Sequence, residues 1–509
     1  MIQAPPALIR ALARDLAAAR YSVEHVRTLW GADAGAALER GNRVPAVRAL
    51  ATRDEAAATL ATLLLLGIAV PASRLDAALP SLGARGAVAA GLATLDGDTA
   101  VPAVDLRPYA FADSRGAGQW WIASDLGELA TGGALRTDHV LGIGGASLTL
   151  SGLLLPGPFE TALDIGTGCG IQALHLAREA RHVVATDISE RALAFARFNT
   201  RLNGVDSVEF RLGSLFDPVA GERFERIVSN PPFVITPRRD GVPEYEYRDG
   251  GLVGDGIVEA MVRGAARHLE PGGIAQLLGN WEDRTGPGGG PGLERAGAWA
   301  DAAGLESWIV QRDRLDPARY AEIWIRDGGT RIDTTEGAGL IEAWLEDFAA
   351  RGVAGVGVGY VLVRSPETEP RLRRLERLDA PLGDAAAGLG GHLAEALENH
   401  DRGTALTDAE LEAATFVVAG DVTEERSHLP GSEHPSVIVL RQGGGFRREV
   451  RADPALTAIV GACDGDLPLG AIVDAVADLL EADAVALRTA VTPAVRELLV
   501  EGFLRFATR

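Results

Sequence analysis

The chain is poor in cysteine, since only Cys169 and Cys463 occur among its 509 residues, far apart in the sequence. Two such cysteines cannot build the disulfide framework of a small secreted domain, so a reducing cytoplasm is the expected setting. Long apolar runs are also missing: the longest, Leu60 to Val70, is about half of the ~20 residues that a membrane-spanning helix needs. The first residues lack the basic-then-apolar profile of a signal peptide. These absences predict a cytoplasmic protein that does not cross a membrane.

Positive charge is scarce as well. Lys and Arg number 49 against 70 Asp and Glu, which gives a formal net charge of −21. This balance disfavours a protein whose whole surface binds nucleic acid or an anionic membrane. It leaves room for a local basic groove, because salt screens surface fields beyond roughly 8 Å. The nine histidines have no metal-ligand spacing, so the sequence predicts no metal site.

The length predicts about two to four domains. Residues 1–117 are expected to be helical and to end in a hairpin, with Val88 to Leu95 and Val101 to Leu106 flanking a turn. Helices followed by a hairpin are the outline of a winged helix. Many small helical domains share that outline, so a wall over the neighbouring domain is favoured here over DNA binding.

Residues 118–366 alternate short apolar strands with amphipathic helices, which predicts an α/β domain with a doubly wound, mostly parallel, Rossmann-like sheet of seven strands. A helical insertion is expected at residues 330–352. The expected strands are Thr161–Ile165, His182–Thr186, Val208–Leu212, Arg226–Ser229, Ile274–Leu278, Ala321–Ile325 and Val356–Val363.

Residues 367–509 are expected to form a small α+β domain without a catalytic motif, with strands near Phe416–Val418 and Ser436–Leu440. The domain opens with the charged stretch Glu367–Arg377. We interpret this stretch as a solvated linker or helix rather than a phosphate-binding patch.

A glycine-rich loop follows the first strand of the central domain, in the sequence from Asp164 through Gly166, Gly168 and Gly170. Glycines there allow a tight turn and the close approach of a ligand. The spacing is Gly-x-Gly-x-Gly, whereas dinucleotide sites carry Gly-x-Gly-x-x-Gly. Asp187 ends the second strand about twenty residues later, where it is placed to accept hydrogen bonds from ribose hydroxyls. The alternative role for Asp187, a cap for the next helix, falls equally well to Ser189.

The loop after the third strand carries Ser214 where related enzymes often present an acid to an adenine amine, with Asp217 nearby. The adenine contacts are therefore expected to depart from that pattern. Besides Asp164, Asp187 and the three glycines, the expected cofactor site includes Thr167, Ile188, Ser214, Leu215 and Asn230.

The most specific motif of the chain is Asn230-Pro231-Pro232-Phe233, which follows an apolar strand. Consecutive prolines cannot continue a central strand, so the strand must stop at Asn230, at the edge where open α/β sheets bind ligands. A planar amine or amide is a poor nucleophile because its lone pair is delocalised. If the Asn230 side chain and the Pro231 carbonyl each accept one N–H, and Phe233 stacks on the planar group, the lone pair can be directed at an electrophilic carbon. Asn230, Pro231 and Phe233 are the expected catalytic residues.

With these motifs, about 230 residues of the chain resemble class I S-adenosylmethionine-dependent methyltransferases that carry an Asn-Pro-Pro-aromatic motif. The motif and the later Arg248-Asp249-Gly250-Gly251 and Gly254-Asp255-Gly256 are most similar to release-factor glutamine methyltransferases, whereas Phe at position 233 resembles RNA guanine-amine enzymes. The resemblance implies S-adenosylmethionine bound by Asp164, the glycine loop and Asp187, and a substrate amine bound by Asn230 and Phe233.

Other residues near the motif allow two interpretations of their role. Arg238 and Arg239 can hold a phosphate or an acidic peptide, or belong to a solvated loop. Tyr245 and Tyr247 can stack on a base or simply pack, and His139 precedes the first strand, where relatives place a segment over the cofactor.

The sequence therefore predicts an N-methyltransferase that acts on a translation component, either an RNA base or a protein glutamine, with a macromolecular partner. A peptide or small-metabolite tailoring enzyme is the alternative within the same chemistry. A non-catalytic adenosylmethionine-binding protein is the alternative from another class. The acidic charge favours the tailoring reading over RNA, and the intact Asn-Pro-Pro-Phe motif argues against the non-catalytic one.

Overall fold

The computed structural model describes residues 2, 4–132, 135–383 and 388–507. The chain forms two compact units: Met1–Ser151 with Gly157–Arg377, and Gly152–Pro156 with Leu378–Arg509. No helix among the described residues is both long and apolar enough to span a bilayer.

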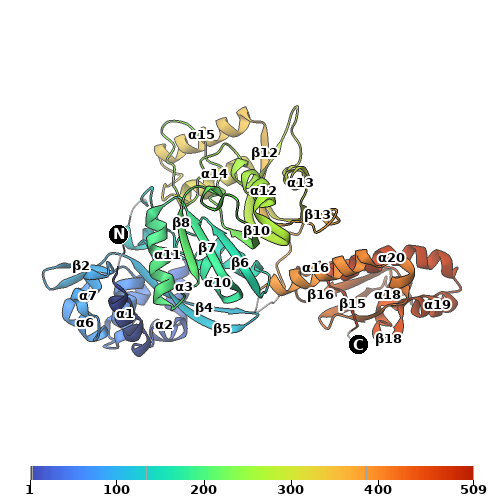
Figure 1. The fold of residues 1–509 in the computed structure, drawn as a ribbon, viewed down its shortest axis with the longest axis horizontal. Helices are drawn as coiled ribbons and strands as arrows, with labels where there is room; N and C mark the ends of the chain where they lie inside the picture. Colours follow the sequence, from blue (N-terminus) through green and yellow to red (C-terminus); the bar gives the residue numbers. More distant parts are fainter. Residues whose placement is uncertain (1, 3, 133–134, 384–387, 508–509) are drawn as a thin grey trace. The chain divides into compact units, whose positions relative to one another are not determined.

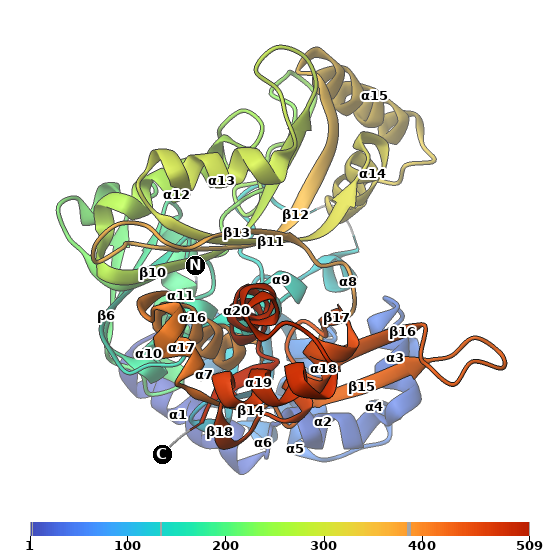
Figure 2. The same cartoon turned by 90° about the vertical axis from the view of Figure 1, so that its right-hand side faces the viewer.

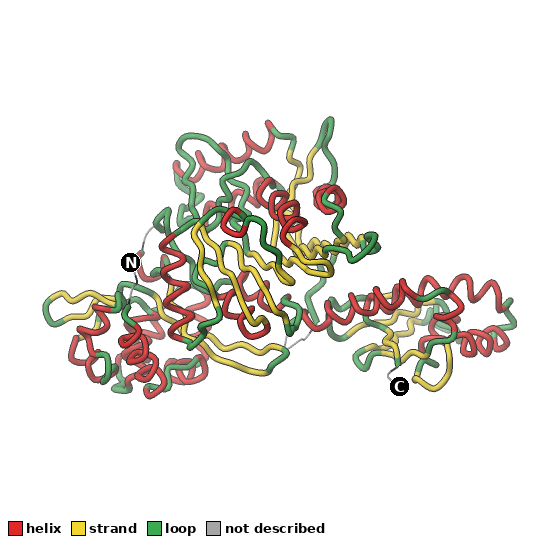
Figure 3. The backbone as a smooth tube through the Cα atoms, viewed as in Figure 1, coloured by secondary structure: helices red, strands yellow, loops and turns green. Residues whose placement is uncertain are grey.

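The first unit is built on an eight-stranded sheet, and Figure 3 shows its strands between helices. Of these strands, β12 runs antiparallel to its neighbours and the other paired strands are parallel. The doubly wound, mostly parallel α/β fold is therefore confirmed. In sheet order the strands are β13 (Arg373–Arg377), β11 (Glu306–Leu315), β12 (Val353–Arg364), β10 (Leu269–Arg284), β9 (Phe224–Ser229), β6 (Phe159–Ile165), β7 (Ala180–Asp187) and β8 (Val208–Leu212).

The prediction of seven strands was wrong, because it counted residues 321–325 as a strand and lacked both β11 and β13, which the charged stretch after residue 366 forms at the edge of the sheet. An edge strand tolerates charge because one of its sides is free. Arg373 pairs there with Asp301 at 3.0 Å, and Arg374 with Glu376 at 2.7 Å. The linker or helix expected at this position is thus a paired strand.

Four helices cover the two faces of the sheet: α10 (Ile171–Glu179), α11 (Glu190–Leu202), α12 (Gly256–His268) and α13 (Gly292–Ala302). Residues of α10 and α11 pack in one hydrophobic cluster with the N-terminal helices, whereas α12 and α13 pack in another cluster with the core of the sheet. Each face of the central strands is therefore buried, which explains why these strands read as continuous apolar runs.

The N-terminal region has the element order of a winged helix. The hairpin expected at 88–106 is present but shorter, because Val88 belongs to α7 and the strands are β2 and β3. The elements are α1 (Pro6–Ala18), α2 (Val23–Trp30), α3 (Ala32–Glu39), α4 (Val44–Ala51), α5 (Ala56–Leu60), the π-helical turn η1 (Ala61–Leu65), β1 (Val70–Pro71), α6 (Ala72–Ala78), α7 (Gly83–Ala89), β2 (Ala93–Asp96) and β3 (Thr99–Pro102).

A two-stranded ribbon, β4 (Asp105–Asp113) and β5 (Gly116–Ser124), joins this region to the central sheet. The side chains of Asn199 on α11 and of Asn203, which follows the helix, accept hydrogen bonds from the backbone N–H groups of Ala123 and Trp121, at 2.8 and 2.9 Å. The expected boundary between residues 117 and 118 falls within β5. The ribbon ties the N-terminal helices to the α11 side of the sheet.

Two helices, α14 (Pro317–Asp327) and α15 (Thr335–Ala350), are inserted between β11 and β12 and lie side by side next to β12 (Figures 1 and 2). The expected strand Ala321–Ile325 was wrong, because these residues belong to α14. Asp316 caps that helix by accepting a hydrogen bond from Arg319 N at 3.0 Å, and Pro317 occupies its first turn. We call residues 316–352 the helical insertion.

The second unit is a small α+β domain with two three-stranded sheets, β15-β16-β17 and β18-β14-β19, around a core that contains Phe416, Leu499 and Phe503. Its elements are α16 (Gly390–Ala405), α17 (Asp408–Glu412), β14 (Thr415–Val418), β15 (Val422–Ser427), β16 (Val437–Gln442), β17 (Glu449–Ala452), α18 (Pro454–Gly461), β18 (Asp464–Pro468), α19 (Leu469–Leu479), α20 (Ala484–Glu501) and β19 (Leu504–Phe506).

Candidate active site

The glycine loop, residues 166–170, joins β6 to α10 and contains glycines of two kinds. Gly166 and Gly168 have φ values of +70° and +55°, and a Cβ on either would meet no atom within 4 Å. The loop therefore borders open space at these two positions. Gly170 is different, since a Cβ there would lie 3.0 Å from Cα of Ala196 on α11. This glycine permits the close packing of the two helices.

Asp164 lies at the end of β6, fully buried beneath the loop. Its Oδ2 accepts a hydrogen bond from Thr167 Oγ1 at 2.6 Å, whereas its Oδ1 is buried and has no partner among the described residues. Burial raises the pKa of this carboxyl to about 7, although the Thr167 hydrogen bond opposes the rise. The carboxyl therefore keeps one unsatisfied oxygen next to the loop.

Asp187 ends β7 and is bonded directly to the glycine loop. Its Oδ2 accepts a hydrogen bond from Gly168 N at 2.9 Å, and its Oδ1 accepts one from Ser189 N at 2.8 Å. The cap of α11 is Ser189, as the alternative assignment anticipated. Burial raises the pKa of Asp187. Ile188, the next residue, leaves 68% of its surface exposed although it is apolar.

The loop after β8 is held against β7 by a hydrogen bond from Gly213 N to the Asp187 carbonyl, at 2.9 Å. Ser214 is exposed, and Leu215 adopts a left-handed conformation with a φ of +47°. Such a backbone is costly for a branched residue. Ser214 and Leu215 therefore stand at the same edge of the sheet as Asp187.

The Asn-Pro-Pro-Phe motif leaves the sheet beside the glycine loop. Ser229 on β9 is paired with Ile165 on β6, and its Oγ donates to the Ile165 carbonyl at 2.8 Å. The next residues, Asn230 and Gly166, therefore depart from neighbouring strands at the same level. The Oδ1 atom of Asn230 is buried and has no hydrogen-bond partner among the described residues.

Residues 233–249, which we call the acceptor loop, fold back on themselves after the two prolines. Phe233 forms an antiparallel bridge with Asp249, and Val234 N donates to the Arg248 carbonyl at 2.9 Å. The Asp249 carboxyl accepts hydrogen bonds from Thr236 Oγ1 and from Tyr245 N. Burial raises the pKa of Asp249, and these two bonds oppose that rise. Asp249 thus organises the loop from within.

The helical insertion contacts the acceptor loop at several points. The Tyr320 hydroxyl accepts hydrogen bonds from Ile235 N at 3.0 Å and from Asn280 Nδ2 at 2.7 Å. The Trp324 ring meets Phe233 edge-on, with centroids 6.3 Å apart and an interplanar angle of 74°. Arg248 Nη1 donates to the Trp324 carbonyl at 2.6 Å. Tyr320 and Trp324 thus contact the loop that follows the Asn-Pro-Pro-Phe motif, although no sequence motif indicated them.

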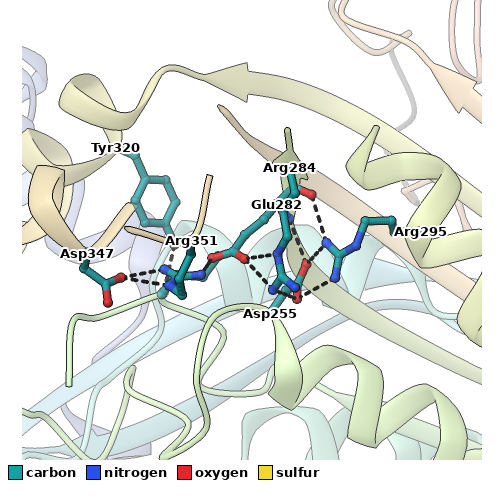
Figure 4. A network of polar contacts seen from close by, with 8 residues as sticks. Asp255, Glu282, Arg284, Arg295, Tyr320, Asp347 and Arg351 are labelled. Atoms are coloured by element: carbon teal, nitrogen blue, oxygen red, sulfur yellow. Dashed lines mark hydrogen bonds and ion pairs between the residues drawn. The ribbon is translucent and has the colours of Figure 1, made fainter. Parts of the chain in front are cut away.

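A balanced network of charges fixes the far end of the insertion to the sheet (Figure 4). Glu282 on β10 is fully buried and pairs with Arg284 and with Arg351. Asp255 accepts hydrogen bonds from Arg284 at 3.0 Å and from Arg295 at 2.6 Å. Asp347 pairs with Arg351 at 2.6 Å. The Gly254-Asp255-Gly256 motif thus belongs to this network and not to the ligand edge.

Residues 137–139, which precede α9 (Gly145–Leu153), also contact the acceptor loop. His139 meets Tyr247 edge-on, with centroids 5.9 Å apart, and Glu246 N donates to the Thr137 carbonyl at 3.0 Å. Burial lowers the pKa of His139. Tyr247 therefore packs on protein, while Gln172 of α10 donates to the Ser147 carbonyl at 2.9 Å.

Comparison with known families divides the chain into three matched segments. The methyltransferase small domain matches residues 144–284. Two domains of unknown function match residues 18–104 and 398–506.

The similar curated proteins include release factor glutamine methyltransferases. The release factor glutamine methyltransferase of Cereibacter sphaeroides is 39% identical over 32% of this chain, and that of Geobacter sulfurreducens is 40% identical over 22%. The chain spans 60% and 42% of the lengths of these two proteins. Among solved structures, the ribosomal protein L11 methylase from Lactobacillus delbrueckii is 15% identical, with a TM-score of 0.26, over 45% of this chain and 81% of its own.

The topology of the sheet and the matched segment agree on the class of the central domain. It is the domain that carries the glycine loop, Asp187 and the Asn-Pro-Pro-Phe motif. Residues 144–284 belong to the class I S-adenosylmethionine-dependent methyltransferases.

Proposed function

We propose that this domain methylates a planar nitrogen that is held between Asn230, the Pro231 carbonyl and Phe233. The single observation that carries the proposal is the Oδ1 atom of Asn230, which is buried and without a partner among the described residues. A buried acceptor without a donor is costly, so such an atom indicates a missing ligand N–H. Asn230 leaves the sheet directly beside Gly166, where the cofactor is expected.

The residues at the ligand edge fit S-adenosylmethionine. Gly166 and Gly168 border open space, the free Oδ1 of Asp164 suits the amino group of the methionine moiety, and Asp187 suits the ribose hydroxyls. The exposed Ile188 offers an apolar surface to the adenine ring. In this proposal Thr167, Ser214 and Leu215 complete the site, and Gly170 acts through helix packing.

When bound, S-adenosylmethionine supplies an electrophilic methyl carbon on a sulfonium. Asn230 and the Pro231 carbonyl each accept one N–H, which makes the nitrogen more tetrahedral and frees its lone pair to form the new N–C bond. The C–S electron pair stays on sulfur, and the nitrogen loses one proton to solvent. Phe233 and the neighbouring Trp324 orient the planar group, and alignment of this kind supplies about 7 kcal/mol or more of the barrier.

For the acceptor, we propose the side-chain amide of a glutamine in a protein of the translation machinery. The named relatives are release factor glutamine methyltransferases, which supports an amide over an RNA base. The acidic balance of the chain also disfavours a nucleic-acid substrate.

The test is transfer of radiolabelled methyl from S-adenosylmethionine into fractionated lysate by the full chain and by Asn230→Ala. We expect Asn230→Ala to bind cofactor normally in calorimetry and to lose roughly two orders of magnitude in transfer, as on removal of a key hydrogen-bonding group. Asn42→Ala, an exposed asparagine of the N-terminal region, serves as the matched control and should transfer normally.

The chemistry of the labelled product identifies the acceptor. A methylated glutamine amide releases labelled methylamine on acid hydrolysis, and protease digestion of the protein makes the label acid-soluble, whereas label on an RNA base becomes acid-soluble on nuclease digestion. Undiminished transfer by Asn230→Ala would disprove the proposed role of Asn230.

A further inference from the structure

The guanidinium of Arg238, in the acceptor loop, has one nitrogen that pairs with a carboxylate and two that have no partner among the described residues. Its Nη1 contacts Glu244 Oε2 at 2.8 Å. Its Nε and Nη2 atoms are buried and have no hydrogen-bond partner among the described residues. A guanidinium cannot lose its charge in a protein, so two buried and unused donors are costly unless a ligand meets them.

The unpaired donors lie on the edge of the guanidinium that other arginines of this chain use for carboxylates. Arg136 directs Nε and Nη2 at the two oxygens of Asp138, both at 2.8 Å. Arg331 does the same with Asp333, at 3.1 and 2.7 Å. Two parallel N–H groups match the two oxygens of a carboxylate, which makes this pairing both strong and directional.

We propose that Arg238 binds, through this edge, the carboxylate of an aspartate or glutamate that flanks the methylated residue in the acceptor peptide. The inference rests on the proposed function, because it assigns a ligand to the same acceptor loop. Arg238 follows Phe233 by only five residues. A second fixed contact would orient the peptide before transfer, beyond what the Asn230 contact alone provides.

The surroundings of Arg238 favour a single carboxylate over a phosphate backbone. Its neighbouring arginines already pair with carboxylates, Arg239 with Glu346 and Arg248 with Asp327, and Arg248 leaves a single buried nitrogen, Nε, without a hydrogen-bond partner among the described residues. A nucleic-acid groove needs several free cations in a row. The acceptor loop instead carries more acidic than basic residues, with Asp240, Glu244, Glu246 and Asp249 against Arg238, Arg239 and Arg248.

The experiment measures peptide binding by calorimetry on the full chain, saturated with S-adenosylhomocysteine so that no transfer occurs. The probes are short peptides with a central glutamine and one aspartate, moved through the flanking positions, each with an asparagine twin. At one position we expect the aspartate peptide to bind about tenfold more tightly than its twin. Arg238→Gln should bind the two peptides equally. Arg239→Gln, the adjacent and more exposed arginine, should keep the preference.

Several results would overturn the inference: no aspartate preference at any position, a preference that survives in Arg238→Gln, or tighter binding of a phosphoserine peptide than of the aspartate peptide. Arg238→Lys keeps the charge but lacks the two parallel N–H groups, so we expect it to retain only part of the aspartate preference. This variant provides the test if Arg238→Gln fails to fold. Binding is read separately from transfer. If the chain methylates glutamine peptides without any preference for aspartate, only the role of Arg238 is refuted. If the proposed function itself is wrong, transfer will be unaffected by Asn230→Ala.

Discussion

The glycine loop and the acceptor loop border the same edge of one sheet, but they are built differently. The glycine loop is held mainly by the end of β7, through bonds from Gly166 N and Thr167 N to the Thr186 carbonyl at 2.9 and 3.0 Å and from Gly168 N to the Asp187 carboxylate at 2.9 Å. The acceptor loop is held by side chains from distant segments, including His139, Tyr320 and Trp324.

The difference also concerns unsatisfied groups. In the acceptor region, the buried atoms without partners among the described residues belong to Asn230, Arg238, Arg248, Asn280 and Trp324. In the cofactor region the corresponding atoms belong to Asp164, Gln172 and Thr186. The unpartnered groups of the acceptor region include one on the helical insertion, so we expect changes to the insertion to alter acceptor binding and to leave cofactor binding unchanged.

The largest effect is expected from Glu282→Ala, because it removes the fully buried carboxylate that Arg284 and Arg351 share, and leaves Arg284 with Asp255 and Arg351 with Asp347. Breaking a buried ion pair from one side typically costs about 3–5 kcal/mol of unfolding free energy. Urea unfolding would measure the loss. As a control, Glu346→Ala removes an exposed pair with Arg239 and should cost less than about 1 kcal/mol. Equal losses for the two variants would mean that the network does not fix the insertion.

The second prediction concerns pH and the cofactor region. Burial raises the pKa of Asp164 to about 7, so below that pH the free protein holds a proton that a cationic cofactor must displace. The Kd for S-adenosylmethionine should therefore rise up to about tenfold for each pH unit below 7. Calorimetry at several pH values would measure this slope, and in Asp164→Asn it should vanish.

The stability of the free protein should depend on pH in the opposite direction to cofactor affinity. Because the folded pKa of Asp164 lies above its ordinary value, its contribution to stability is fully present below that ordinary pKa and is lost as pH rises through 7. Asp164→Asn should therefore gain stability relative to wild type at alkaline pH. A pH-independent Kd in the wild-type chain would remove Asp164 from the cofactor site.

Much of the sheet could be predicted from the sequence, because its central strands are short apolar runs whose neighbours along the chain are also neighbours in space. The strand Val208–Leu212 has the predicted bounds, and β9 ends at Ser229 as Pro231 requires. The cofactor loop was found for the same reason, since its glycines and Asp164 lie within a few residues of one another.

The acceptor region could not be predicted, since Tyr320 and Trp324 lie some ninety residues from the motif that they contact. Ala321–Ile325 alternates like a strand, but the Asp316 cap and Pro317 start a helix there. Conversely, Glu306–Leu315, which forms β11, was not predicted as a strand because it carries many polar residues. Its charges are compensated in the folded state, where Glu306 pairs with Arg364 and Gln311 accepts from Trp281 Nε1 at 2.9 Å.

The third prediction separates the two loops directly. Tyr320→Phe removes the acceptor for Ile235 N and Asn280 Nδ2, and both donors are buried. We expect a loss of about 1–3 kcal/mol in unfolding free energy, and a raised KM for the acceptor with an unchanged Kd for the cofactor. Steady-state kinetics and calorimetry on one preparation would test both. A changed cofactor Kd would show that the two loops are coupled.

The smallest effect is expected at Ser214, which is exposed and stands where related enzymes often carry an acid. Ser214→Asp would offer a charged acceptor to the adenine amine, a gain of about 0.5–1 kcal/mol at an exposed site and hence roughly two- to fivefold tighter cofactor binding. The control is an S-adenosylhomocysteine analogue whose adenine amine is replaced by an oxo group, for which the substitution should bring no gain. If Ser214→Asp changes the affinity for both ligands by the same factor relative to wild type, Ser214 lies outside the adenine site. Main-chain groups such as those of Leu215 would then have to make the base contacts.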